Sequence, residues 1–324
     1  MEHMKNIQQR LAPELQAMNH IIVTSLHTSN EMMDGIVMRY LKVKGKQIRP
    51  MLVILGAKMF GAVTEEVLCA GAALEILHNA TLIHDDVVDE TALRRGNPTI
   101  NATMGNHVAV LVGDYFVSNA LAVGIRTGNV SVVQALSSLG KELSLGEIDQ
   151  ITTARDHIFD TLRYFTVIRQ KTASLFMKCV RMGMEVGGAP VEFQAPMERY
   201  AELLGLCFQI KDDIFDYFPN PQIGKPTGND LREGKVTLPL LLALEKAPAA
   251  ESEAMKELIR QGELDKARID ALVEFAKANG GIDAAYAVMR DMQREADAII
   301  APMPDSDSKE AFRAIFDYII ARDR

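Results

Sequence analysis

The sequence predicts an all-α protein, folded as a single helical domain that spans residues 1–324. Apolar residues recur at three- and four-residue spacings along most of the chain, which is the period of a helix. Alternating β-branched runs between tight turns, the pattern of strands, are nearly absent. Between about residues 64 and 218 the expected helices are apolar on more than one stripe, as in helices surrounded by others. No linker divides the chain, so we expect one large domain.

Each helix follows from a stretch of this apolar period, and most breaks between helices have a local cause. Gly187-Gly188-Ala189-Pro190 cannot continue a helix. Residues 219–230 hold three Pro, two Gly and two Asn, which predicts a loop. In chain order the expected helices cover roughly residues 5–27, 29–42, 48–60, 64–92, 99–127, 130–149, 155–187, 191–218, 235–246, 251–262, 265–280, 282–301 and 306–322.

The composition excludes several classes of protein. The net charge is −8, without the basic excess typical of nucleic-acid binders, so we expect no nucleic-acid partner. The three cysteines are far apart and form no CxxC pair, which argues against a disulfide framework and against a zinc site. The first 20 residues do not resemble a signal peptide, and no run reaches the ~20 apolar residues of a membrane span. We therefore expect a cytoplasmic protein without an integral membrane segment.

The segment HDDVVDETALRRG carries the first candidate site. Asp85 and Asp89 are four residues apart, so a helix places both carboxylates on one face. A hard divalent cation such as Mg²⁺ removes their mutual repulsion and takes its remaining ligands from water and substrate phosphates. Arg94 and Arg95 follow, and paired arginines suit a diphosphate. Such acidic pairs also occur on solvated helix faces, but the neighbouring residues here are apolar.

The same DDxxD spacing recurs at Asp212, Asp213 and Asp216, again within an apolar helix. Two such clusters are much less expected by chance than one. If they face each other in a helical bundle, they can hold several Mg²⁺ ions around one diphosphate. Lys225 and Lys235 follow in the chain and can reach phosphate oxygens, although either alone is an ordinary surface residue.

Five motifs occur along the chain in the order GKQIRP (45–50), DDVVDETALRRG (85–96), KTA (171–173), FQIKDDIFD (208–216) and GKPTGNDLREGKVTLP (224–239). With these motifs the chain resembles the trans-isoprenyl diphosphate (polyprenyl) synthases, and in particular their long-chain members. The resemblance covers at least residues 44–239. The departures are mild: Lys44 and Gln47 replace a Gly and an Arg of the family's GGKRxRP.

The resemblance implies a helical bundle of the isoprenoid synthase type with a central cavity, a homodimer, and substrates that are isopentenyl diphosphate and an allylic diphosphate. It implies about three Mg²⁺ ions, bound by Asp85, Asp89, Asp212 and Asp216. Residues implied to bind the allylic diphosphate are Arg94, Lys171, Lys225 and Lys235. Those implied to bind isopentenyl diphosphate are Lys46, Arg49, His78 and Arg95. Thr172 and Gln209 would stabilise the allylic cation and position the substrates.

Small residues about one turn before Asp85 bear on product length. If the tail runs back along this helix, Ala80 and Thr81 form its floor. Bulky aromatic residues there accompany short products in the family, so small ones predict a C30–C50 product, of the quinone side-chain class. Three alternatives stay open: a short-chain C15–C20 synthase, a terpene cyclase, and a non-catalytic partner subunit of a heteromeric synthase. Cyclases usually lack the complete motif set, and partner subunits tend to lose its aspartates or arginines.

Overall fold

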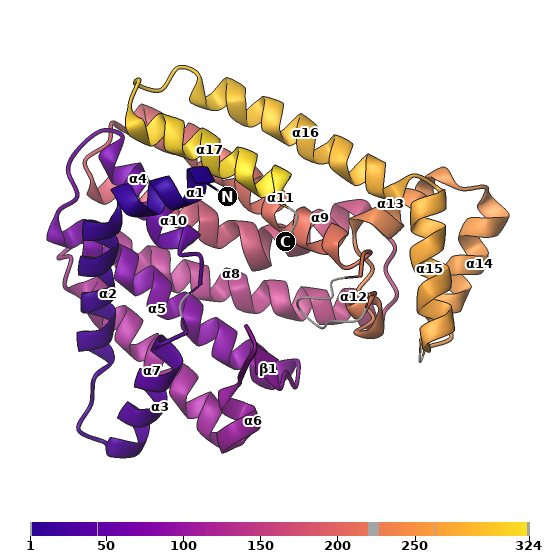
Figure 1. Ribbon diagram of the computed structural model, residues 1–324, viewed down its shortest axis with the longest axis horizontal. Coiled ribbons are helices and arrows are strands. Elements are labelled where there is room, and N and C mark those ends of the chain that lie inside the picture. The colour runs from indigo at the N-terminus through magenta and orange to yellow at the C-terminus, as the bar shows by residue number, and fades with distance from the viewer. Residues whose placement is uncertain (1, 44, 220–226, 263, 323–324) are drawn as a thin grey trace. The chain divides into compact units, whose positions relative to one another are not determined.

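The computed structural model describes residues 2–43, 45–219, 227–262 and 264–322 (Figure 1). Within these residues helices predominate and only two short strands occur, which confirms the predicted all-α class. The elements are α1 (Glu2–Arg10), α2 (Ala12–Leu26), α3 (Glu31–Leu41), α4 (Ile48–Lys58), α5 (Glu65–Val88), β1 (Leu93–Arg94), β2 (Asn97–Pro98), α6 (Ile100–Met104), α7 (Asn106–Ile125), α8 (Val130–Arg155), α9 (Thr161–Ile168), the π-helical turn η1 (Arg169–Ala173), α10 (Ser174–Val186), α11 (Val191–Phe215), α12 (Asn229–Arg232), α13 (Leu238–Lys246), α14 (Ala249–Arg260), α15 (Lys266–Ala278), α16 (Gly281–Ile300) and α17 (Asp307–Ala321).

Most predicted helices are present, and three predicted as continuous are divided. The first is divided at Leu11, just before Pro13, which sits in the first turn of α2, where a missing N–H costs nothing. The predicted helix over 99–127 is divided at Gly105, whose φ of 83° suits glycine. The predicted helix over 155–187 becomes α9, η1 and α10. The predicted break at 187–190 is confirmed between α10 and α11.

The two short strands form a hairpin that the apolar period did not predict. Leu93 pairs with Pro98 and Arg94 with Asn97. The two loop residues, Arg95 and Gly96, have φ values of 53° and 75°. Two successive positive φ angles define the type I′ turn, whose twist matches that of a hairpin. The hairpin therefore places the paired arginines of the first motif at a tight turn.

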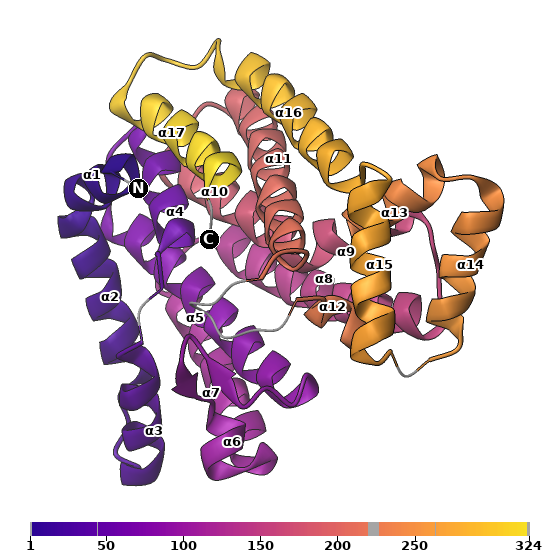
Figure 2. The ribbon, with the colours of Figure 1, turned by 45° about the vertical axis from the view of Figure 1, so that its right-hand side comes forward.

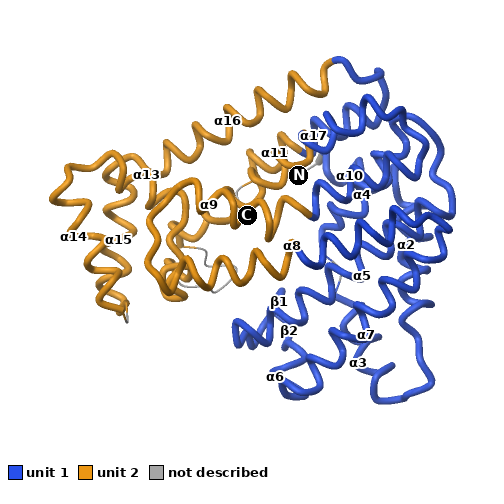
Figure 3. The backbone as a smooth tube through the Cα atoms, turned by 180° about the vertical axis from the view of Figure 1, so that it is seen from behind, with its two compact units in different colours: residues 1–141, 175–199, 302–315 blue, residues 142–174, 200–301, 316–324 orange. Residues whose placement is uncertain are grey.

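The chain forms two compact units (Figure 3). The first comprises residues 1–141, 175–199 and 302–315. In it α5 packs against α2, α4 and α7 (Figure 1). Gly183 of α10 lies against α4 so closely that an added Cβ would be 2.2 Å from the backbone oxygen of Val53. Close helix packing around α5 positions the first candidate site.

The second unit comprises residues 142–174, 200–301 and 316–324. Its α13 packs against α15 and α16, and all three lie side by side in Figures 1 and 2. A buried apolar cluster including Leu240, Ile269 and Leu272 joins α13 to α15. Gly281 begins α16, where an added Cβ would meet the carbonyl oxygen of Pro239 at 2.0 Å.

Two helices, α5 and α7, are long and apolar enough to cross a membrane by length and composition. The most apolar 18-residue window is 67% buried within the structure in α5 and 39% buried in α7. The core helices of soluble proteins pass the same test, so this finding is weak evidence for a span.

Candidate active site

In the first unit, α5 carries the acidic pair of the first motif. Asp85 lies in the last turn of α5, and Asp89 directly follows the helix. The Asp89 N–H donates to the Asp85 carbonyl oxygen at 2.8 Å, so the helical turn extends to both residues and stacks them as predicted. Asp85 is partly buried and Asp89 is exposed.

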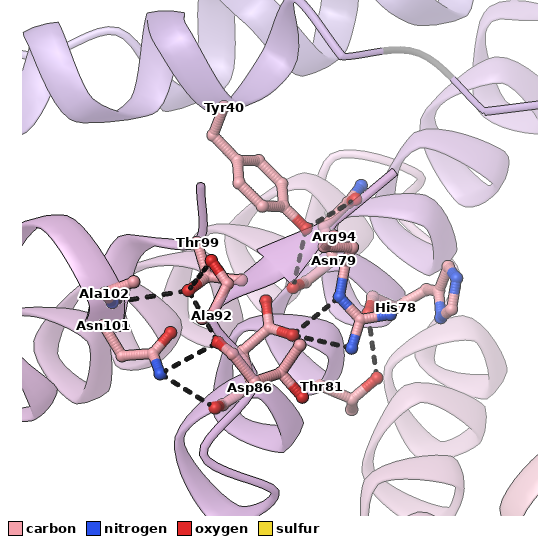
Figure 4. Close-up of polar contacts among 11 residues, drawn as sticks. Tyr40, His78, Asn79, Thr81, Asp86, Ala92, Arg94, Thr99, Asn101 and Ala102 are labelled. Carbon is pink, nitrogen blue, oxygen red and sulfur yellow. Dashed lines mark hydrogen bonds and ion pairs between the residues drawn. The ribbon is translucent and has the colours of Figure 1, made fainter. Parts of the chain in front are cut away.

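Asp86 forms an ion pair within the protein. Its side chain is 4% exposed, and its Oδ1 accepts from Nε and Nη2 of Arg94, both at 2.7 Å (Figure 4). The Asn101 amide donates to the Asp86 carbonyl oxygen at 3.0 Å and so joins α6 to the end of α5. Asp86 thus orients the arginine to which the sequence assigned diphosphate binding.

The hairpin also brings the second arginine to the GKQIRP loop. Arg95 Nη1 donates to the Val43 carbonyl oxygen at 3.4 Å. A Cβ at Gly45 would lie 2.7 Å from Arg95 Nη2, so a larger residue there would shift this guanidinium. Lys46 is exposed in the same loop, and the guanidinium of Arg49 lies 5.3 Å from the centre of the Phe176 ring.

His78 lies on the same helical stripe, two turns before Asp85, and is 8% exposed. Burial lowers its pKa well below the usual value, and the charges of Arg49, Arg95 and Arg94 lower it further. The imidazole is therefore neutral at pH 7 and can donate one hydrogen bond. Three of the four residues assigned to isopentenyl diphosphate thus influence one another electrostatically.

Glu75 belongs to this cluster, and the sequence analysis missed it. Burial raises the pKa of Glu75, while Arg49 and Arg95 act in the opposite direction. Its Oε2 is buried and has no hydrogen-bond partner among the described residues. The available signal was an acidic residue three positions before His78, within an apolar stretch of α5.

Ala80 and Thr81 differ in their relation to Asp85. At about 100° per residue, Thr81 lies about 40° from Asp85 around the helix axis, whereas Ala80 lies about 140° away. Ala80 is fully buried, and Thr81 is partly buried with its hydroxyl on the His78 carbonyl oxygen at 2.8 Å. His84, on the same side of α5 as Ala80, contacts α7, where Gly113 leaves space for its ring. Of the two, Thr81 is closer to the face that carries the acidic pair.

In the second unit, the KTA motif lies in the π-helical turn η1. Such turns are rare and frequent at functional sites. Lys171 forms an ion pair with Glu147 at 2.5 Å, and Gly146 leaves room for its backbone, since a Cβ there would be 2.9 Å from the Lys171 nitrogen. The Thr172 hydroxyl donates to Oε1 of Gln209 at 2.8 Å. The structure therefore brings Lys171, Thr172 and Gln209 together.

The aspartates of the second motif have three different sets of partners. Asp212 accepts from Arg322 at 2.7 Å. Asp213 accepts from Gln209 at 2.8 Å and from the Tyr164 hydroxyl at 2.6 Å. Burial is the main reason that the pKa of Asp213 rises to about 7, although both hydrogen bonds act to lower it.

Asp216 joins the second motif to the last one. Its two carboxylate oxygens accept from the backbone N–H groups of Asn229 and Asp230, each at 3.0 Å. Lys235 forms an ion pair with Glu233 at 2.6 Å. Lys225, the other lysine assigned to diphosphate binding, lies outside the described residues.

A cavity of about 160 Å³ within the second unit is lined by the residues of these motifs. They line it together with polar groups of α8 and α9. Its walls include Gln150, His157, Tyr164, Lys171, Thr172, Gln209, Asp213, Asp230 and Lys235. Its lysines can neutralise an anion, and its hydroxyl and amide oxygens can face a cation.

The two acidic motifs fit a hard divalent cation by their donor chemistry. No three Asp, Glu, His or Cys side chains converge as a complete metal site within the described ranges. Each motif instead offers carboxylates one helical turn apart, and Mg²⁺ typically uses one or two carboxylates with substrate phosphates as further ligands. Asp85 and Asp89 of the first motif are at least partly accessible. When bound, such an ion would offset negative charge developing on a departing diphosphate.

Comparison with known proteins assigns the family. The polyprenyl synthetase family model matches residues 30–276. The chain is 30% identical to the octaprenyl diphosphate synthase of Escherichia coli K12, over 99% of this chain and all of that protein. It is 32% identical to the nonaprenyl diphosphate synthase of Mycobacterium tuberculosis, over 92% of this chain and 89% of that protein.

Solved structures support the same family assignment. A decaprenyl diphosphate synthase from Rhodobacter capsulatus superposes with a TM-score of 0.92 at 32% identity, covering 99% of both chains. A polyprenyl synthase from Caulobacter crescentus CB15, complexed with calcium and isoprenyl diphosphate, superposes with a TM-score of 0.91 at 29% identity, covering 98% of both. The order of motifs, the all-α fold and these matches lead to one conclusion: the chain belongs to the polyprenyl synthetase family and is a prenyltransferase.

Proposed function

We propose that this enzyme condenses isopentenyl diphosphate head-to-tail onto an allylic diphosphate, such as farnesyl diphosphate, and makes a long all-trans polyprenyl diphosphate of C30–C50. The observation that carries this proposal is the match, over nearly the whole chain, to octaprenyl, nonaprenyl and decaprenyl diphosphate synthases. A quinone side chain is the proposed use of the product.

The side chains at the site suit the ionisation of an allylic C–O bond. Diphosphate leaves readily only if its growing negative charge is neutralised. We assign this task to Arg94, Lys171 and Lys235, with Lys225. Lys46, Arg49, His78 and Arg95 would hold the diphosphate of isopentenyl diphosphate. The Thr172 hydroxyl and the Gln209 amide oxygen would face the allylic cation, and water must be excluded from it.

The acidic residues would hold the metal. We infer that Asp85, Asp89, Asp212 and Asp216 bind about three Mg²⁺ ions when substrate is present. The calcium in the Caulobacter structure supports the use of a divalent cation. Asp212 pairs with Arg322, so a metal ion at Asp212 would compete with this guanidinium for the carboxylate.

Assembly and location are also proposals. Apolar side chains are exposed along α7: Val110, Leu111, Leu121 and Ile125. Exposed apolar surface of this kind favours a subunit interface, and we infer a homodimer. We also propose a cytoplasmic location, because the first 20 residues do not resemble a signal peptide.

Product length differs among the relatives of this chain. Identity alone does not separate the lengths, because the chain is also 36% identical to a geranylgeranyl pyrophosphate synthase from Bacteroides thetaiotaomicron, with a TM-score of 0.85. The small residues Ala80 and Thr81 support the longer product.

The test is direct. Purified protein is incubated with Mg²⁺, farnesyl diphosphate and isopentenyl diphosphate, and products are measured by mass spectrometry after dephosphorylation. A ladder that ends at C30 or longer supports the proposal, and a stop at C20 or below assigns a short-chain synthase. No product with any allylic primer would contradict it and indicate that a second component is needed. One relative, from Geobacillus stearothermophilus, is named heptaprenyl diphosphate synthase component 2.

A further inference from the structure

Four side chains of the second unit form one continuous chain of hydrogen bonds beside the 160 Å³ cavity. Thr172 donates to Oε1 of Gln209 at 2.8 Å, and Nε2 of Gln209 donates to Oδ1 of Asp213 at 2.8 Å. The hydroxyl of Tyr164 donates to Oδ2 of the same carboxylate at 2.6 Å. The family motifs include the threonine and the glutamine as groups that face the cation. Tyr164 lies outside the motifs, and Asp213 lies within one but has no role assigned to it.

The direction of this chain is determined at the aspartate. An amide carries a donor at one end and an acceptor at the other, in nearly the same shape. Asp213 accepts at both of its oxygens, from the Tyr164 hydroxyl and from the NH₂ group of Gln209, so the Gln209 amide oxygen is turned toward Thr172. The threonine has a single proton and donates it to that oxygen, so its own lone pairs stay available to the cavity.

This direction matters for a carbocation. Oxygen lone pairs and the negative end of an amide dipole stabilise positive charge, whereas an N–H group aimed at it opposes its formation. A reversed Gln209 amide would present its NH₂ group to Thr172, whose hydroxyl would then accept and turn its proton toward the cavity. A single flip of the amide would thus replace two stabilising oxygens with two donors.

Tyr164 secures the aspartate from a separate helix. It lies on α9, whose first turn is capped by Asp160, and its side chain is 7% exposed. Asp213 is 3% exposed, so loss of the tyrosine hydroxyl would leave Oδ2 without its donor in a buried place, where an unmet hydrogen bond is costly. The carboxylate is thus held from both sides, by Tyr164 and by Gln209.

We propose that Tyr164 and Asp213 are positioning residues for prenyl transfer: they hold the Gln209 amide, and through it the Thr172 hydroxyl, with oxygen lone pairs toward the allylic cation. This inference rests on the proposed function. It concerns the rate of ionisation and condensation, because neither residue is assigned to the diphosphates or the metal.

The test compares four variants in the same condensation assay, with kcat and both KM values measured. Tyr164→Phe removes only the hydroxyl. Asp213→Ala removes the carboxylate, and Asp213→Asn removes its charge but keeps an oxygen that can accept from Gln209. Tyr217→Phe is the matched control, because Tyr217 is also buried. Its hydroxyl lies 3.2 Å from the Thr237 hydroxyl and is not hydrogen-bonded to Thr172, Gln209, Asp213 or Tyr164 within the described residues.

We expect Tyr164→Phe to lower kcat about tenfold and Asp213→Ala about a hundredfold, with both KM values within about threefold of wild type. Asp213→Asn should recover most of the loss, and Tyr217→Phe should stay within about twofold of wild type. Should Asp213→Ala fail to fold, Tyr164→Phe and Asp213→Asn still decide the matter.

Three results would overturn the inference. The first is a Tyr164→Phe variant with wild-type kcat. The second is an Asp213→Asn variant as impaired as Asp213→Ala, which would assign the effect to negative charge near the metal. The third is a Tyr217→Phe control as slow as Tyr164→Phe, which would indicate a general packing effect. Wild-type protein that makes no product would instead overturn the proposed function.

Discussion

Replacing Thr81 by phenylalanine should shorten the product by at least two isoprene units. Thr81 lies about 40° from Asp85 around the axis of α5, and a tail that runs back from the acidic pair passes it first. Leu74 lies on the same stripe, two turns deeper, and is 1% exposed. Seven residues separate the two positions, or ~10.5 Å along the helix axis. An extended isoprene unit spans ~5 Å, so a ring at position 81 removes about two units relative to a floor at Leu74.

Burial decides whether a substitution changes product length without also destabilising the fold. Thr81 is only partly buried, so a larger side chain there disturbs the core less. Ala80 is fully buried, and a phenylalanine there would overpack the core at a cost of ~1–3 kcal/mol. We expect Ala80→Phe to shorten the product as well, accompanied by a fall in Tm of about 2–4 °C per kcal/mol.

The assay is the product ladder, measured by mass spectrometry with Mg²⁺, farnesyl diphosphate and isopentenyl diphosphate. Val191→Phe is the control, since Val191 is an exposed apolar residue at the start of α11 and belongs to neither acidic motif. Its product should be that of wild type. An unchanged ladder for Thr81→Phe, or equal shortening by Val191→Phe, would refute the assignment of the tail to the Thr81 stripe.

Three further predictions concern metal, acid and packing. Asp85→Ala should abolish turnover and leave the melting curve unchanged, as should excess EDTA on wild type; activity in either case would contradict the metal assignment. Burial holds the pKa of His78 well below its value in the unfolded chain, so the stability of the wild type should fall as the pH drops below about 6.5. In thermal melts between pH 7.5 and 5, the His78→Gln variant should lose less stability than the wild type. Gly183→Ala should destabilise the fold strongly, since its Cβ would meet the Val53 oxygen at 2.2 Å. Gly140→Ala, whose Cβ would have no atom within 4 Å, should stabilise the fold by ~0.5–1 kcal/mol. Equal denaturant midpoints for the two variants would refute this packing argument.

Local chemistry made much of the helical architecture predictable. A helix repeats every 3.6 residues, so the apolar spacing places its buried face without reference to the rest of the chain. The Gly187–Pro190 break is equally local. The role of a single glycine inside a long periodic stretch was harder to predict. Gly105 ends α6, whereas Gly113 and Gly183 lie within helices and allow a neighbouring group to approach closely. Whether a glycine ends a helix or admits a neighbour depends on what packs against it.

The family, the helical class and the stacking of Asp85 on Asp89 were all predictable from the sequence, because each depends on short motifs or local spacing. The tertiary structure decided which side chains meet across long separations. Arg94 is oriented by Asp86, the Arg95 guanidinium lies close to Gly45, and Asp213 accepts from Tyr164. Such partners are selected by packing of helices, and nothing in local spacing specifies which buried donor will reach which buried acceptor.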